Sequence, residues 1–140
     1  MDRCYKPWMV LLLVTSNLLW GCSAARVHLK EQPSGILNFS VEESYDTVFQ
    51  RVANQAKQCY EAGGRHIEAH LFRDKEMAEV VIAIVHLGTS HTLLTAEIKA
   101  ISPNSTQVNT YHGYSPPGAW RDGAYTVQRW ATSKEPYCPR

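Results

Sequence analysis

Residues 77–87 read Met-Ala-Glu-Val-Val-Ile-Ala-Ile-Val-His-Leu, and the fold is best approached from this stretch. Its centre, residues 80–85, is a continuous apolar run in which all but one side chain are β-branched. β-Branched side chains are enriched in strands, where they pack well on the pleated surface. We therefore predict a strand over 77–87.

Further segments on both sides of this strand show the two-residue period of strands. Residues 66–72 alternate apolar and polar side chains, which favours a strand and leaves a helix as the alternative. Residues 93–101 alternate in the same way, and residues 107–114 are predicted to form a further strand. The apolar positions expected on one face are Ile67, Ala69, Leu71, Leu94, Ala96, Ile98 and Ala100. Short turns at 74–76, 88–90 and 102–105 join these four strands into an antiparallel meander.

A first strand and two helices complete the order. Residues 35–41 alternate and predict a strand, and from Tyr45 apolar residues recur at the three- and four-residue spacing of a helix with one buried face. A serine, Ser40 or Ser44, can cap this helix, and Gly63-Gly64 is predicted to end it. Residues 121–132 suit a second helix. The predicted fold is one α+β domain, residues 35–140, of order β-α-β-β-β-β-α, with both helices packed on one face of an antiparallel sheet.

Residues 1–21 have the composition of an export signal. Arg3 and Lys6 give a positive start, and an apolar span of 14 residues follows over 8–21. This span is short of the roughly 20 residues that a helix needs to cross a bilayer. Without residues 1–21 the chain has 12 basic and 12 acidic side chains. The domain is therefore neutral, and its composition does not indicate a nucleic-acid-binding protein.

The leader closes with Leu19-Trp20-Gly21-Cys22, which resembles the lipobox of bacterial lipoproteins. Leu19 and Gly21 match the pattern of that family, whereas Trp20 is bulkier than the usual residue. The resemblance implies cleavage before Cys22, a diacylglycerol on its thiol and an acyl chain such as palmitate on the new amine. More than one acyl chain is needed for stable anchoring.

Several expectations depend on Cys22. Residues 22–34 become a lipidated N-terminus and a polar tether. Ser23 follows the cysteine, and by the rule of the family this implies the outer membrane, facing the periplasm. The alternative is an ordinary signal peptide cut near residues 23–25, with Cys22 discarded.

The other cysteines predict a disulfide. Cys4 lies in the leader and Cys22 takes the lipid, which leaves Cys59 and Cys138. An exported protein lives in an oxidising compartment, where such a pair is expected to be bonded. The alternative, a redox-active thiol pair, usually has close spacing such as C-x-x-C. A Cys59–Cys138 bond would tie the first helix to the tail after the second helix, which places both on the same side of the sheet.

The element order is similar to the helix-grip, or TATA-binding-protein-like, arrangement found in the domains of the BamC outer-membrane assembly lipoproteins. The resemblance spans residues 35–138 and concerns the order of elements only. A shared fold does not transfer function, so this resemblance implies an architecture and no activity.

His66, Glu68 and His70 are the candidates for a metal site. On a strand they share one face, and two imidazoles and a carboxylate could bind zinc. The alternative is the polar, solvated face that an antiparallel sheet commonly has. The spacing is not the H-E-x-x-H of metalloproteases, and the chain has no Gly-x-Ser-x-Gly elbow or phosphate-binding glycine loop. We therefore expect no catalytic residue and no cofactor.

Aromatic side chains are dense near the C-terminus, with Tyr111, Tyr114, Trp120, Tyr125, Trp130 and Tyr137. On the surface they could bind a protein, peptide or lipid, with Tyr111, Tyr114 and Trp120 as candidates. In the interior they would form the core between the sheet and the second helix. The sequence leaves both interpretations open.

Together these features predict a non-catalytic, lipid-anchored protein of the bacterial envelope. We expect a binding or scaffold role in the periplasm, with the membrane and an envelope protein as partners and no nucleic acid. One alternative is a metal-binding protein or metal-dependent enzyme that uses His66, Glu68 and His70. The other is a periplasmic inhibitor or immunity-type lipoprotein.

Overall fold

The computed structural model of the chain describes residues 35–61, 64–113 and 123–139. The elements are β1 (Gly35–Val41), α3 (Tyr45–Tyr60), β2 (Arg65–Phe72), a 3₁₀ turn (Arg73–Lys75), β3 (Met77–His86), β4 (Thr89–Ser102), β5 (Ser105–His112) and α4 (Gly123–Thr132). No helix in these ranges is long and apolar enough to span a bilayer. The predicted order of elements is confirmed, and residues 66–72 lie in a strand and not in a helix.

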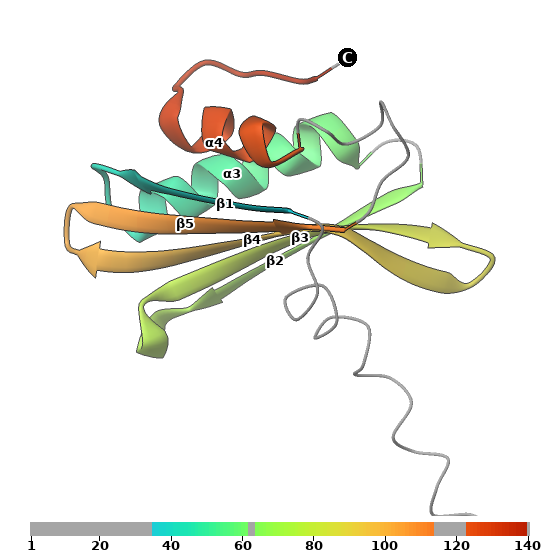
Figure 1. Cartoon of the computed structure of the whole chain (residues 1–140), viewed down its shortest axis with the longest axis horizontal. Coiled ribbons are helices and arrows are strands. Elements are labelled where there is room, and N and C mark those ends of the chain that lie inside the picture. Colours follow the sequence, from blue (N-terminus) through green and yellow to red (C-terminus); the bar gives the residue numbers. More distant parts are fainter. Residues whose placement is uncertain (1–34, 62–63, 114–122, 140) are drawn as a thin grey trace, which may run out of the picture.

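The five strands form one antiparallel sheet in the order β1-β5-β4-β3-β2. The last four strands are the predicted meander, and β1 pairs with β5, for example through Phe39 and Val108. This pairing makes β1 and β2 the two edges of the sheet. Both helices lie on the same side of the sheet (Figure 1), so the predicted α+β arrangement is confirmed.

The core fills the space between the sheet and the helices. The strand register sets the apolar residues of neighbouring strands opposite one another, as with Val80 and Ala96 or Ile82 and Leu94. From the helix side, Val48 and Trp130 reach the same core and are almost completely buried. Full burial of an aliphatic or aromatic side chain contributes about 1.5–3 kcal/mol, so this layer is the main source of stability.

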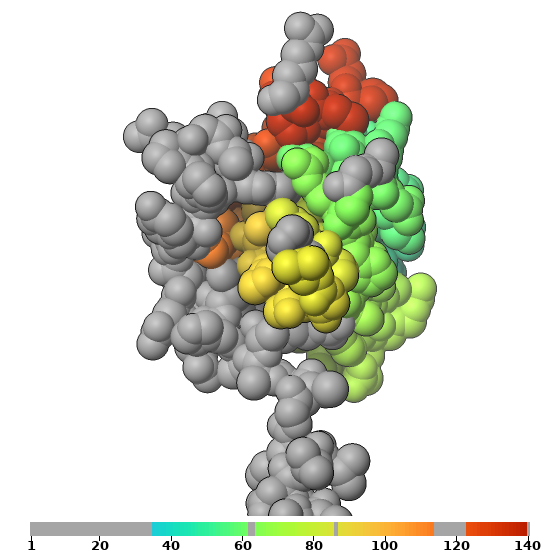
Figure 2. All heavy atoms as spheres, turned by 90° about the vertical axis from the view of Figure 1, so that its right-hand side faces the viewer, coloured from blue at the N-terminus to red at the C-terminus, as the bar shows by residue number. Residues whose placement is uncertain are grey.

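Several boundaries differ from those that the sequence predicts. Strand β4 begins at Thr89, four residues before the predicted start, so the β3–β4 hairpin turns at Leu87 and Gly88 alone. Both residues have positive φ, 49° and 77°, as a two-residue hairpin turn of the I′ type requires. The longer hairpin projects from one end of the sheet (Figure 1) and faces the viewer in Figure 2. Helix α3 ends at Tyr60 and not at the glycine pair, of which Gly63 lies outside the described residues.

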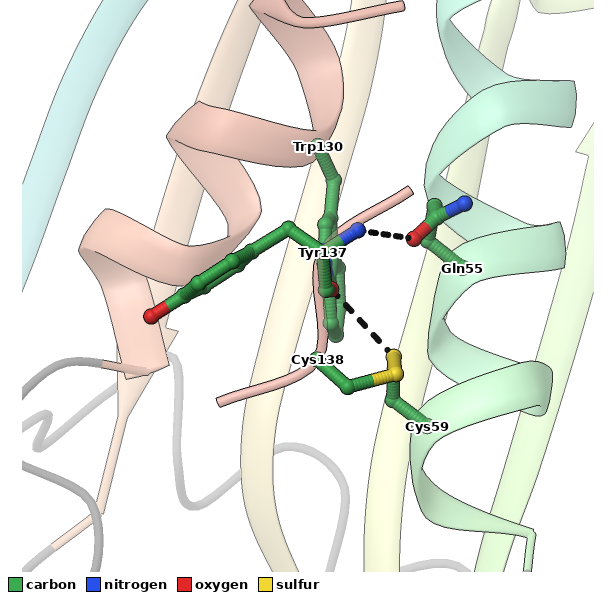
Figure 3. The surroundings of a disulfide bond; sticks show 5 residues. All are labelled: Gln55, Cys59, Trp130, Tyr137 and Cys138. Carbon is green, nitrogen blue, oxygen red and sulfur yellow. Dashed lines mark hydrogen bonds between the residues drawn. A yellow bond between two sulfur atoms is a disulfide. The ribbon is translucent and has the colours of Figure 1, made fainter. Parts of the chain in front are cut away.

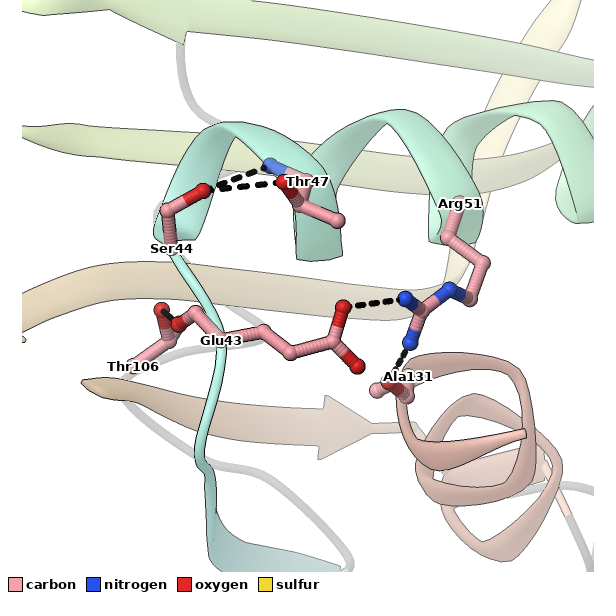
Figure 4. Close-up of polar contacts among 6 residues, drawn as sticks. All are labelled: Glu43, Ser44, Thr47, Arg51, Thr106 and Ala131. Atoms are coloured by element: carbon pink, nitrogen blue, oxygen red, sulfur yellow. Dashed lines mark hydrogen bonds and ion pairs between the residues drawn. The ribbon is translucent and has the colours of Figure 1, made fainter. Parts of the chain in front are cut away.

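The N-terminus of α3 is fixed by polar contacts, which include one with β5, where the Thr106 hydroxyl donates to the Glu43 carbonyl at 2.7 Å, and one with α4 (Figure 4). Ser44 is the cap, because its hydroxyl accepts a hydrogen bond from the Thr47 backbone N–H at 3.4 Å. The Arg51 guanidinium pairs with Glu43 and donates to the carbonyl oxygen of Ala131, at the end of α4, at 2.6 Å. This hydrogen bond to Arg51 holds the pKa of Glu43 below its usual value of 4.5. Arg51 therefore joins the start of one helix to the end of the other.

The predicted disulfide between Cys59 and Cys138 is present (Figure 3). It joins α3 to the tail after α4, on the helix side of the sheet. The tail is also held by its backbone at Tyr137, whose N–H donates to Gln55 Oε1 at 3.0 Å and whose carbonyl accepts from Trp130 Nε1 at 2.6 Å. The Cys59 sulfur lies 3.3 Å from that same carbonyl, but a disulfide sulfur carries no proton, so this is a contact and not a donated hydrogen bond.

Candidate functional site

The sheet has a second face, turned away from α3 and α4, and this face carries the predicted site residues. Because side chains alternate along a strand, His66, Glu68 and His70 point away from the helices while Ile67 and Ala69 point toward them. Their partners in β3 follow from the register: His66 lies opposite Ala83, Glu68 opposite Val81 and His70 opposite Glu79. The shared face that the alternation predicts is therefore real.

Glu68 lies between the two histidines of the same strand. Its Oε2 atom is 3.4 Å from Nε2 of His70, and its Oε1 atom is 3.7 Å from Nε2 of His66. The Glu68 side chain is 23% exposed, against 60% for His66 and 42% for His70. Within the part of the chain that the structure describes, no three His, Cys, Asp or Glu side chains are grouped so that they could hold a metal ion. The observed arrangement is a carboxylate flanked by imidazoles.

A line of polar side chains crosses the second face from edge to edge, and we call it the polar row. The register pairs its members strand by strand, in the order His70, Glu79, Glu97, Asn109 and Asn38. The members are half-buried or exposed. Opposed side chains of an antiparallel pair lie about 5 Å apart at Cβ, so Glu79 and Glu97 are cross-strand neighbours on this face. Lys99 follows on the same face of β4, two residues beyond Glu97.

Next to the polar row the second face is covered and not exposed. Val81, Ala83 and Thr95 point away from the helices, yet each is only 3% exposed. We call these three residues the buried patch. Val81 and Thr95 are direct partners in the register, and Tyr111 of β5 lies opposite Thr95. The buried patch is separate from the core cluster, whose β3 members are Ala78, Val80 and Ile82.

The aromatic residues divide between core and surface. Trp130 is 1% exposed and meets the ring of Tyr60 edge to face, with 5.6 Å between the ring centroids. Tyr125, five residues earlier in α4, is 62% exposed, so the core interpretation holds for Trp130 and not for Tyr125. Tyr111 is half-buried on the second face. The candidates Tyr114 and Trp120 lie outside the described residues, as does Cys22.

Sequence reasoning did not single out Glu79, Glu97 or Asn109. A signal for Glu79 was present, because it is the one charged side chain in residues 77–85. A charge in such a run marks a position that faces away from the core. The alignment of Glu79 with Glu97 and Asn109 follows only from the register of three strands.

No protein-family model matches this chain, and comparison with curated proteins gave no match. Any functional inference therefore depends on the sequence patterns, the fold and the second face.

Proposed function

We propose that this chain is a non-catalytic lipoprotein of the bacterial envelope, anchored through Cys22, which binds a protein partner with the polar row. The lipobox-like ending Leu19-Trp20-Gly21-Cys22 supports the anchor. The resemblance in element order to the domains of the BamC lipoproteins is compatible with an envelope role, but carries no function by itself.

The observation that carries the binding proposal is the polar row. Its carboxylates at Glu79 and Glu97 are opposed across two central strands, on a face that the helices leave uncovered. Opposed carboxylates concentrate negative charge, which favours lysine or arginine side chains of a partner. Asn38 and Asn109 add amide groups that can both donate and accept hydrogen bonds. We therefore expect a partner that presents a basic segment.

Affinity enrichment from envelope extract tests the binding proposal. The detergent-solubilised protein is compared with the double variant Glu79→Gln/Glu97→Gln. A matched control is Glu42→Gln/Glu61→Gln, which removes the same charge from two exposed positions away from the sheet face. We expect one stoichiometric partner with the native chain and the control, and its loss with the polar-row variant. Equal recovery with all three proteins would contradict the proposal.

Mass analysis of the N-terminal peptide tests the anchor. The exported protein should begin at Cys22 and carry the added mass of a diacylglycerol and of an acyl chain such as palmitate. Ser23→Ala should keep the lipid, and Cys22→Ser should lose it. An unmodified chain that begins near residues 23–25 would show that the ordinary signal peptide is correct.

The same preparations test the two alternatives. Stoichiometric zinc that is lost in the His66→Ala/His70→Ala variant would favour the metal-binding protein or enzyme. A secreted enzyme as the recovered partner, with its activity blocked in the complex, would favour the inhibitor or immunity-type lipoprotein.

A further inference from the structure

The buried patch lies beside the point where the described chain begins. Gly35 is the first residue of β1. Cross-strand pairing connects it to His112 of β5, which pairs with Leu94 of β4, which in turn pairs with Ile82 of β3. Thr95 and Val81 form the centre of the buried patch. Thr95 follows Leu94 in β4, and Val81 precedes Ile82 in β3. The chain therefore enters β1 one residue position away from the set of paired residues that contains Thr95 and Val81.

Distances along the sheet show that this chain can reach the patch. Neighbouring strands are about 4.8 Å apart, so β1 and β3 are separated by about 14 Å. An extended chain covers about 3.3 Å per residue, so four or five residues suffice. Residues 22–34 provide 13. The segment from 114 to 122 also starts at this end, but it must lead to α4 on the helix side.

The helix side of the sheet is blocked at Gly35. The imidazole of His112 occupies this space so closely that a Cβ on Gly35 would lie 2.1 Å from His112 Nε2. A chain that enters β1 from the helix side is obstructed by this ring, whereas a chain that enters from the second face is not. The geometry at Gly35 therefore favours an approach from the side of the buried patch.

Composition also matches the tether to this face. Residues 26–30 read Arg-Val-His-Leu-Lys, with apolar and basic or imidazole side chains in alternation. In an extended chain Val27 and Leu29 share one side, which suits a patch made of Val81, Ala83 and Thr95. Arg26 and Lys30 are cationic, and Glu68 lies opposite Val81 of the buried patch on the same face. The tether and the second face are therefore complementary both in charge and in hydrophobicity.

We infer that the tether, residues 23–34, docks on the second face of the sheet and covers Val81, Ala83 and Thr95. The tether is then a part of the domain and not a free linker. If Cys22 carries lipid, a docked tether also turns the second face toward the membrane. The polar row then lies at the margin of the area that the tether covers. The docking itself does not require the lipid, so it stands apart from the proposed function.

Thiol labelling tests the docking, and threonines of the sheet provide matched positions. Thr95→Cys lies in the buried patch, Thr110→Cys is fully buried on the helix face, and Thr89→Cys is exposed at the start of β4. Each variant is made in the full chain and in a chain whose residues 23–34 are replaced by a Gly/Ser segment of equal length. Maleimide labelling is followed residue by residue by peptide mass, because Cys59 and Cys138 are bonded and do not react.

We expect Thr95→Cys to react slowly with the native tether, and at least about tenfold faster once the tether is replaced. Thr110→Cys should stay slow and Thr89→Cys fast in both chains, which also shows that the fold is intact. Fast labelling of Thr95→Cys with the native tether would overturn the inference. Slow labelling with the replaced tether would also overturn it, because another segment or a partner would then cover the patch. Repeating the labelling in the Cys22→Ser chain separates this result from the question of the lipid.

Discussion

Loss of the Cys59–Cys138 disulfide should remove a large part of the stability of the domain. The two residues are 79 positions apart, so the bond closes a loop of about three quarters of the domain. In the chain-entropy model a loop of this length stabilises the folded state by about 4.5 kcal/mol at 25 °C. Domains of this size are stable by only about 5–15 kcal/mol, so the variant Cys59→Ala/Cys138→Ala should be marginal.

The expected fall in melting temperature follows from this free energy. Unfolding entropy is about 2.1 cal/mol/K per residue, or about 0.2 kcal/mol/K for roughly 100 residues. A loss of 4.5 kcal/mol therefore lowers the melting temperature by about 20 °C. The urea m-value should also rise, because the unfolded chain without the bond exposes more surface. Circular dichroism during heating and urea titration measures both quantities on the detergent-solubilised protein.

Two comparisons separate the disulfide from the other contacts of the tail. The native chain with reductant should match the double cysteine variant. A chain that ends at Ser133 also loses the hydrogen bonds at Tyr137 and the stacking of Arg129 on its ring, at 3.9 Å from the centroid. This truncation should be less stable than the cysteine variant by a further 1–3 kcal/mol or so. A fall of less than about 5 °C in the cysteine variant, with an unchanged m-value, would refute the entropic argument.

Three further predictions concern the contact between the two helices through Arg51, the ion pair of Arg51 with Glu43, and the contact of Trp130 with the tail. Arg51→Met removes the donor to Ala131 and the partner of Glu43. It should lower the free energy of unfolding, measured by urea titration, by about 1–3 kcal/mol. A loss below about 0.5 kcal/mol would contradict the bridging role of Arg51. Arg51 lowers the pKa of Glu43, so this carboxylate stabilises the fold above its usual pKa of 4.5, and the contribution is lost as pH falls through the lowered value. Native protein should therefore lose more stability than Glu43→Gln as the pH falls below 4.5, and parallel pH profiles would contradict this. Trp130→Phe removes the indole N–H that donates to Tyr137, so hydrogen exchange of the tail should accelerate while that of β4 does not change; a tail that stays protected would show that the disulfide alone holds it.

The element order was accessible to sequence reasoning because local patterns determine it. The β-branched run in β3, the alternation in β2 and the helical spacing from Tyr45 each reflect which side of an element is buried. The disulfide was accessible for another reason, since elimination left one pair of cysteines. Boundaries were less accessible: the start of β4 at Thr89 depends on cross-strand pairing with His86, and polar residues 89–92 give no hydrophobic signal of it.

The second face contains features that local sequence patterns do not predict. The sequence alone indicated that His66, Glu68 and His70 share a face, because they lie on one strand at alternate positions. It could not align Glu79, Glu97 and Asn109 with His70, because that row crosses strands whose register is set by long-range pairing. Nor could it predict that Thr95, on the polar side of β4, is as inaccessible as a core residue. Alternation along one strand is a local property of the chain, whereas the neighbours that a side chain meets across a sheet are decided by tertiary pairing and packing.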